Sequence, residues 1–180
     1  EIELTSGWNL WSTYIDPSTN DFCDGLGGSM ATIFSDVVED LVIVKNQYGD
    51  VYWPAYGLNS IGCISNGEGY QAKMSNDVML TVSGSLIPSD SELELNFGWG
   101  IIGYLHQDCF NVVDMMSSVV SNLTILKDEN GSVYWPMFGL NSIGELTEGK
   151  GYQAKMASDD VLVLEGNLVP YDLALELTEG

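Results

Sequence analysis

Residues 41–62, LVIVKNQYGDVYWPAYGLNSIG, decide the organisation of this chain, because they return at 123–144 as LTILKDENGSVYWPMFGLNSIG. The offset of 82 residues continues without a gap through the segments GEGYQAKM and GKGYQAKM. Between 41–87 and 123–169, 25 of 47 aligned residues are identical, which is far more than chance gives. The 180-residue chain is therefore predicted to contain two tandem copies of one module.

The module boundaries follow from weaker matches around this core. The Gly-Trp pair that ends at Trp8 matches the one that ends at Trp99, at an offset of 91, so the first copy carries an insertion, placed at about 17–28. The segment IELTSG near the start also matches LELNFG between the copies and LELTEG at the end. We therefore predict one module at 1–91 and a second at 92–180, which ends at the start of a further repeat boundary.

The charge of the chain excludes several classes of partner. Asp and Glu number 26 against 5 lysines and no arginine, for a formal net charge of −21. A protein that binds phosphate groups needs a basic patch, and five lysines in so acidic a chain cannot build one. We therefore expect no nucleic-acid partner and no binding to anionic membranes. No stretch approaches the roughly 18–20 apolar residues that span a bilayer, so we expect no membrane insertion, and any secretion signal has been removed or lies upstream.

Runs of β-branched, aromatic and aliphatic residues predict the strands of each copy. The predicted strands at 41–45 and 51–56 are expected to form a hairpin, whose turn in the second copy is Asn130-Gly131. The predicted strands at 69–74 and 78–82 are expected to form another hairpin. The predicted strands of the first copy are 8–15, which reads as largely buried, 41–45, 51–56, 69–74 and 78–82, followed by a linking strand at 92–97.

One helix is predicted in each copy. Apolar residues recur at helical spacing after Ser29, a good N-cap residue, and describe an amphipathic helix of about three turns. The stripe is Met30, Ile33, Phe34, Val37 and Val38, and the second copy has Val112, Met115, Met116, Val119 and Val120. The predicted fold class is mainly β (α+β). Each module is a small, mostly antiparallel sheet or partial barrel with one helix, and the two pack with pseudo-two-fold symmetry.

The pattern GW, then VYWPx[FY]GxNxIG and GxGYQxKM, resembles a tandem repeat module of large secreted and cell-surface proteins of marine Bacteroidetes. The resemblance covers both copies, hence nearly the whole chain, and it implies an extracellular accessory or adhesive role. The first copy departs from the pattern through its insertion and through Cys63, where the second copy has Glu145.

The aromatic hairpin is the main candidate for a binding site. Alternate residues of a strand face opposite sides, so Tyr52, Pro54 and Tyr56 are expected to share one face while Trp53 takes the other. Either the rings pack in the core, or one set is exposed and stacks on sugar rings or anchors a protein partner. The candidate binding residues are Tyr52, Trp53, Tyr56, Tyr134, Trp135 and Phe138.

Four of the five lysines stand at equivalent positions of the two copies, within predicted strands. For these residues, Lys45, Lys73, Lys127 and Lys155, we expect an ion pair or hydrogen bond to a carboxylate of the same module, with the aliphatic stem packed on the sheet.

The insertion gathers oxygen ligands that calcium prefers, although their spacing is not that of an EF-hand. The candidate metal ligands are Asp16, Asn20, Asp21 and Asp24. An unoccupied, solvated acidic loop is the alternative. No other cofactor is expected.

Three cysteines leave at least one thiol unpaired. Cys23 and Cys109 each precede the helix of their module, so packing about a pseudo-two-fold axis would allow a disulfide between them. The alternative is free thiols.

No constellation of catalytic residues is apparent, and the single histidine, His106, has no counterpart in the first copy. We therefore expect a secreted or cell-surface structural or adhesive repeat module that is not an enzyme. The alternative is a carbohydrate-binding module that uses the Tyr-Trp-Pro hairpin. The expected partners are a polysaccharide or another cell-surface protein.

Overall fold

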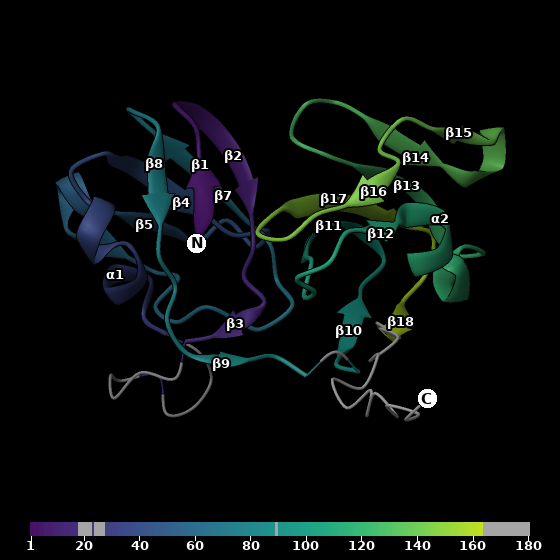
Figure 1. Cartoon of the computed structure of the whole chain (residues 1–180), viewed down its shortest axis with the longest axis horizontal. Coiled ribbons are helices and arrows are strands. Elements are labelled where there is room, and N and C mark those ends of the chain that lie inside the picture. Colours follow the sequence, from purple (N-terminus) through teal and green to yellow (C-terminus); the bar gives the residue numbers. More distant parts are fainter. Residues whose placement is uncertain (18–22, 24–27, 89, 164–180) are drawn as a thin grey trace, which may run out of the picture.

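A computed structural model of the chain describes residues 1–17, 23, 28–88 and 90–163 (Figure 1). The two copies lie side by side, with their helices at opposite outer ends. The elements of the first copy are β1 (Ile2–Leu4), β2 (Gly7–Trp11), β3 (Ile15–Asp16), α1 (Met30–Ile33), η1 (Ser35–Val37), β4 (Leu41–Lys45), β5 (Val51–Trp53), η2 (Pro54–Tyr56), β6 (Leu58–Asn59), β7 (Tyr70–Met74), β8 (Val78–Leu80) and β9 (Ser85–Leu86).

The second copy repeats this order with small differences. Its elements are β10 (Glu92–Leu95), β11 (Gly98–Gly103), β12 (Phe110–Asn111), α2 (Val112–Met115), η3 (Ser117–Val119), β13 (Leu123–Lys127), β14 (Val133–Trp135), η4 (Pro136–Phe138), β15 (Leu140–Asn141), β16 (Glu145–Leu146), β17 (Gly151–Met156) and β18 (Asp160–Val163). The predicted mainly β class is confirmed, with antiparallel pairing throughout the described strands and no closed barrel.

Each copy is built on one five-stranded sheet. The strand order is β2-β7-β4-β5-β6 in the first copy and β11-β17-β13-β14-β15 in the second. The hairpin of β4 and β5 was expected and is confirmed. The second predicted hairpin is wrong, because β2 and β4 occupy both edges of β7, and β8 leaves the sheet to pair with β1. The predicted linking strand, β10, pairs with β18 in the same way.

The core of each copy lies on the inner face of its sheet. In the first copy Trp11, Val44 and Ala72 are fully buried there, under a cover formed by the helical segment and the β1–β8 ribbon. The Trp11 ring packs edge-on against Phe34, with 5.2 Å between ring centroids. An apolar inner face of this kind supplies most of the stability of a small β module.

The predicted length of three helical turns is wrong, although the apolar stripe of the helical segment does face the core. The helical segment breaks at Phe34 in the first copy and at Met116 in the second, where ψ is near zero, and it continues as a short 3-10 helix. Asn111 caps the second segment, since its Oδ1 accepts a hydrogen bond from the Val113 N–H at 2.9 Å.

Reciprocal backbone bonds join the two copies. The Ser12 N–H donates to the Gly149 carbonyl (3.0 Å), and at the equivalent place the Gly103 N–H donates to the Gly67 carbonyl (2.8 Å). Each contact is the counterpart of the other under the sequence repeat. The junction therefore has the pseudo-two-fold symmetry that was expected, with the buried Ser12 next to Gly103 at its centre.

A second reciprocal pair uses side chains from the tips of the β4–β5 and β13–β14 hairpins. Gln47 Oε1 accepts a hydrogen bond from the Ile101 N–H (2.9 Å), and Glu129 Oε2 accepts one from the Leu10 N–H (3.0 Å). Glu129 also forms an ion pair with Lys150, with 2.7 Å between Nζ and Oε1. Each hairpin thus satisfies the open edge of the sheet in the other copy.

Close approach at the junction explains the glycines of GEGY and GKGY. A Cβ on Gly69 would lie 2.7 Å from the Ile102 carbonyl oxygen, and one on Gly151 would lie 2.9 Å from that of Trp11. Both obstacles are backbone atoms of the other copy, which cannot move aside as a flexible side chain can. Within the described residues, no helix is long and apolar enough to cross a membrane.

Candidate functional site

The aromatic hairpin has one exposed ring and one partly buried ring in each copy, in an arrangement that differs from the prediction. Strand β5 ends at Trp53, and Pro54 opens the 3-10 helix η2. Alternation stops at this point, so Tyr56 turns back onto Trp53, with 4.5 Å between ring centroids and 68° between ring planes. Tyr56 is 74% exposed, and Trp53 is partly buried. The predicted division of faces is therefore wrong for Tyr56.

The second copy repeats the arrangement with different side chains. Trp135 and Phe138 lie 4.7 Å apart at 85°, and Phe138 is 67% exposed. Rings at these angles do not form one flat platform. Tyr52 and Tyr134, which were also candidate binding residues, lie buried in the two cores because they occupy inward positions of β5 and β14.

A tryptophan in contact with two lysines stands on the outer face of each sheet. Trp8 of β2 is 49% exposed, and the Nζ atoms of Lys45 and Lys73 lie 5.1 Å and 5.9 Å from its ring centroid. These distances are typical of cation–π contacts. Trp8 and Lys73 are direct cross-strand neighbours of β2 and β7, so the sheet register sets the contact.

The second copy has the same cluster around Trp99 of β11, which is 52% exposed. Lys127 and Lys155 place their Nζ atoms 5.1 Å and 5.7 Å from the ring centroid of Trp99. The predicted carboxylate partners are therefore wrong: within the described part of the chain, none of these four lysines forms an ion pair. We call these two groups of three residues the Trp–Lys clusters.

Trp8 and Trp99 were not among the predicted binding residues, because their strand was expected to be largely buried. A signal was present in the alternation of the strand, in which Trp8 and Trp11 fall on opposite faces. The lysines gave a second signal, since a pair of charges kept within two strands requires that one face of those strands be open to water.

A cleft of about 250 Å³ opens beside Trp99 at the junction of the copies. Four side-chain amides line it together with Trp99, Gly100 and Ile101. They are Asn46, Gln47, Gln71 and Gln153. Gln71 and Gln153 are outward residues of β7 and β17, so the cleft draws on the outer faces of both sheets.

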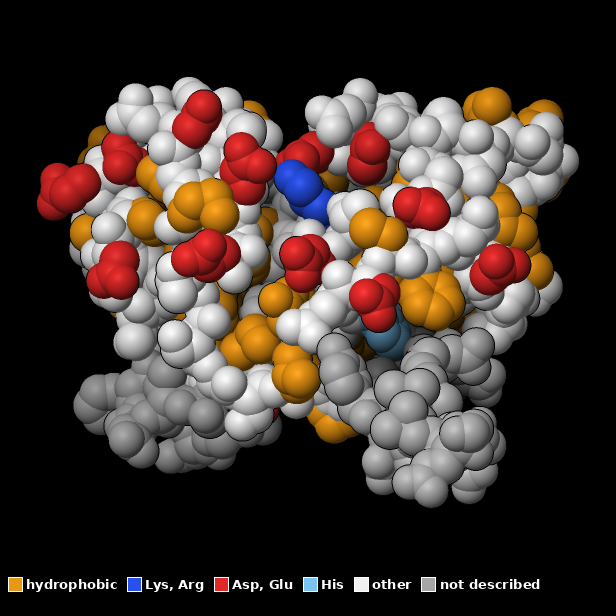
Figure 2. Space-filling view, viewed as in Figure 1, with side chains coloured by type: hydrophobic (Ala, Val, Ile, Leu, Met, Phe, Trp, Pro, Cys, Tyr) orange, Lys and Arg blue, Asp and Glu red, His pale blue; other side chains and the backbone are white. Residues whose placement is uncertain are grey.

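A larger cleft of about 510 Å³ borders Trp99 on another side, between β10 and the loops of the first copy. Its lining includes the carboxylates of Glu68, Glu92 and Glu94 and the exposed Phe97. Figure 2 shows one face of the molecule, on which acidic side chains are scattered over both copies and lysine appears at one place between them.

The calcium prediction falls mainly on residues outside the described ranges, since Asn20, Asp21 and Asp24 are not described. Asp16 lies in β3, and its Oδ1 is buried without a hydrogen-bond partner among the described residues. Those residues contain no group of three or more His, Cys, Asp or Glu side chains that would hold a metal ion.

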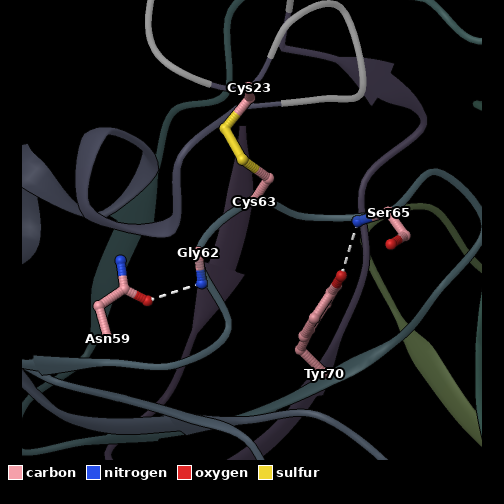
Figure 3. The surroundings of a disulfide bond; sticks show 6 residues. All are labelled: Cys23, Asn59, Gly62, Cys63, Ser65 and Tyr70. Atoms are coloured by element: carbon pink, nitrogen blue, oxygen red, sulfur yellow. Dashed lines mark hydrogen bonds between the residues drawn. A yellow bond between two sulfur atoms is a disulfide. The ribbon is translucent and has the colours of Figure 1, made fainter.

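The disulfide joins Cys23 to Cys63, with 5.8 Å between their Cα atoms (Figure 3). The predicted bond between Cys23 and Cys109 is therefore wrong, and Cys109 is a free, exposed thiol. The reason is local: Cys63 lies in the loop that pairs with Ser29 at the start of the helical segment, next to the insertion. The bond ties the insertion to its own module.

His106 lies in the second core region, against the rings of Tyr104 and Phe110. Its Nε2 is buried and has no hydrogen-bond partner among the described residues. Burial lowers the pKa of His106 below its ordinary value, although the nearby Asp108 carboxylate acts in the opposite direction.

Comparison of the chain with protein-family models, with curated proteins and with solved structures gave no match in any of the three.

Proposed function

We propose that this chain is a non-catalytic adhesive module of a secreted or cell-surface protein, and that it binds polysaccharide on the outer faces of its two sheets. One observation carries the proposal. Trp99 is half-exposed at the rim of a cleft that four side-chain amides line. Asn46 and Gln47 already accept backbone hydrogen bonds through their side-chain oxygens. Gln71 and Gln153 are therefore the amides offered to a ligand. An aromatic ring next to these two amides offers what a sugar needs, because the ring packs on its apolar face and the amides both donate to and accept from its hydroxyls.

Repetition favours a polymer as the ligand. Trp8 and Trp99 occupy equivalent outward positions in the two copies, and each has aromatic hairpin residues on the same copy. A chain with repeating sugars can engage both copies at once, so that two weak contacts combine into stronger attachment. A module of this kind attaches a cell surface to a polymer without catalysing a reaction.

The extracellular part of the proposal rests on the disulfide and on the resemblance. A bond between Cys23 and Cys63 is compatible with an oxidising compartment such as the cell exterior. The resemblance to repeat modules of secreted proteins supports the same location. Calcium remains part of the proposal at the insertion that follows Asp16, so binding should be measured in calcium and again in a chelator.

The test compares two pairs of aromatic substitutions on a panel of immobilised polysaccharides. We expect Trp8→Ala with Trp99→Ala to weaken binding at least about tenfold, since each loses a stacking surface worth roughly 1 kcal/mol. The matched pair is Tyr56→Ala with Phe138→Ala, which removes exposed rings from the hairpins. Circular dichroism and thermal unfolding establish that every variant is folded.

The result locates the site. A large loss only in the Tyr56 and Phe138 pair would move binding to the hairpins, where the rings are more exposed. Absence of binding to every polysaccharide, with folded wild-type protein, would overturn the proposal and leave a structural role between cell-surface proteins.

A further inference from the structure

The outer faces of the two sheets are the only places in the described strands where this acidic chain gathers positive charge. Four of its five lysines stand there, although Asp and Glu outnumber lysine by 26 to 5. Solubility does not require such an arrangement, because the net charge of −21 already provides it. The distribution therefore calls for a separate explanation.

The same faces exclude carboxylates. Cross-strand register assigns the outward positions of each sheet, since directly opposed residues share a face. No Asp or Glu occupies these positions in the four longer strands of either sheet, which are β2, β7, β4 and β5 in the first copy and β11, β17, β13 and β14 in the second. The outward residues are Trp8, Leu10, Ile43, Lys45, Val51, Trp53, Gln71 and Lys73 in the first copy, and Trp99, Ile101, Ile125, Lys127, Val133, Trp135, Gln153 and Lys155 in the second.

The lysines of these faces are open to an external anion. Lys73 and Lys155 are exposed, and within the described residues neither they nor Lys45 and Lys127 form an ion pair. The fifth lysine, Lys150, is different, because it is already paired with Glu129 at the junction. Each Trp–Lys cluster therefore presents two unpaired ammonium groups over one half-exposed indole ring.

We propose that the Trp–Lys clusters bind an acidic polysaccharide, one whose sugar rings carry carboxylate or sulfate groups. This inference rests on the proposed function and adds the charge of the ligand to it. The two ammonium groups hold an anionic substituent, while the indole ring and the amides of Gln71 and Gln153 contact the sugar that carries it. The two clusters stand at equivalent places, as a polymer with regularly spaced charges requires.

A protein partner fits these faces less well. The centres of protein interfaces are depleted in lysine, because its flexible, strongly hydrated ammonium group is costly to bury. A polysaccharide leaves the ammonium groups partly in water and meets them with charges that are themselves solvated. The half-exposed ring of Trp8, with two lysines beside it, suits that wet contact.

The large negative charge of the protein does not prevent this binding at moderate salt. Screening limits interactions between exposed charges to about 8 Å at physiological ionic strength. On the face that Figure 2 shows, acidic side chains are scattered over both copies, whereas the outward strand positions of the sheets hold lysine alone among charged residues. The carboxylates of Glu68, Glu92 and Glu94 line the cleft on another side of Trp99 and oppose an anion there. We therefore expect the anionic group to bind on the side of the ring that carries Lys127 and Lys155.

The experiment uses pairs of polymers that share one sugar backbone, of which one member is acidic and the other is neutral. The first pair is polygalacturonate and its methyl-esterified form, and the second is dextran sulfate and dextran. Affinity electrophoresis or calorimetry at about 0.15 M salt, a concentration that screens remote charges, measures each polymer with the whole chain. We expect at least tenfold preference for one or both acidic polymers over the neutral match, and the preferred pair tells carboxylate from sulfate.

Three single-charge variants locate the effect. Lys73→Gln and Lys155→Gln each remove a cluster lysine, and Lys150→Gln removes the same unit charge from the junction. We expect each of the first two to weaken binding of the acidic polymer several-fold, their combination to weaken it about tenfold or more, and Lys150→Gln to change it less than twofold.

The outcomes separate this inference from the proposed function. Acidic and neutral polymers could bind equally well, with Trp8→Ala and Trp99→Ala abolishing the binding of both. That result would overturn the preference for an acidic ligand but would support polysaccharide binding as the function. Equal weakening by all three lysine variants would show a general charge effect and would overturn the clusters as the site. Absence of binding to all four polymers and to the wider panel would overturn both.

Discussion

The two copies differ most where the chain passes from the first sheet strand to the helix. The first copy carries an insertion there, fastened by the Cys23–Cys63 disulfide, whereas the second has β12 paired with β16, with Glu145 in place of Cys63. In both, the first helical N–H still donates to the same glycine carbonyl, that of Gly62 or Gly144. This region therefore tolerates change, while the core, the junction and the Trp–Lys clusters are kept in both copies.

The largest expected effect tests whether inner and outer tryptophans have different roles. Trp11→Ala should lower the free energy of unfolding by about 3–5 kcal/mol, because it leaves a cavity under a fully buried ring. Ile102→Ala, at the equivalent position of the second copy, should cost about 2–5 kcal/mol. Denaturant unfolding measures both. Trp8→Ala serves as the control, and a comparable loss there would contradict its assignment to an exposed face.

The second prediction removes the main covalent difference between the copies. Replacing Cys23 and Cys63 together by serine should destabilise the chain by about 2–4 kcal/mol, since the disulfide closes a loop of 40 residues in the unfolded state. Thermal unfolding with and without reductant checks this. Reductant should lower the Tm of the natural chain and leave the double variant unchanged. An equal response in both would place the sensitivity elsewhere.

A third prediction concerns the helix start of the second copy. Asn111→Ala should cost about 1 kcal/mol, because it removes the side-chain acceptor of the Val113 N–H. Asn111→Asp keeps an acceptor at the same place and should stay close to the natural stability. If both substitutions have equal effects in denaturant unfolding, the cap does not account for the loss.

The smallest expected effect comes from His106, which replaces Ile15 of the first copy in the aligned sequence. Burial holds its pKa in the folded chain below the value of about 6.5 that it has when unfolded, so folding favours the neutral ring. The stability that this provides is complete above about pH 6.5 and is lost as the pH falls through the lower folded pKa. His106→Ile should flatten the dependence of unfolding free energy on pH between about 5 and 7.

Much of the fold could be predicted because the chain contains two copies of the same module, and each pattern could be checked in both copies. The apolar stripes that begin at Met30 and Val112 have the same spacing but different residues, and such a shared spacing indicates that the side chains pack in the core. The hairpin of β4 and β5 was predictable for a similar reason, since its turn and both strands are local in sequence.

The errors concern partners that lie far apart in the chain. The strands that pair with β7 are β2 and β4 and not the next strand in the chain, β8. Lys73 contacts Trp8 only because the pairing of β7 with β2 forms. The partner of Cys23 likewise depends on the loop that carries Cys63 and returns to the helix start. Local patterns do not contain such pairings. The end of β5 at Trp53 was a local error, since Pro54 already indicated a break.

The reciprocal junction has a consequence for how a longer array is assembled. The junction uses the β2 or β11 edge of each sheet together with one hairpin tip of each copy, at Leu10 with Glu129 and at Ile101 with Gln47. A contact of this symmetry is closed and leaves no equivalent surface for another copy. A protein with further copies would therefore be a string of pairs, in which the unit that folds, duplicates and can be deleted as a whole is two modules long.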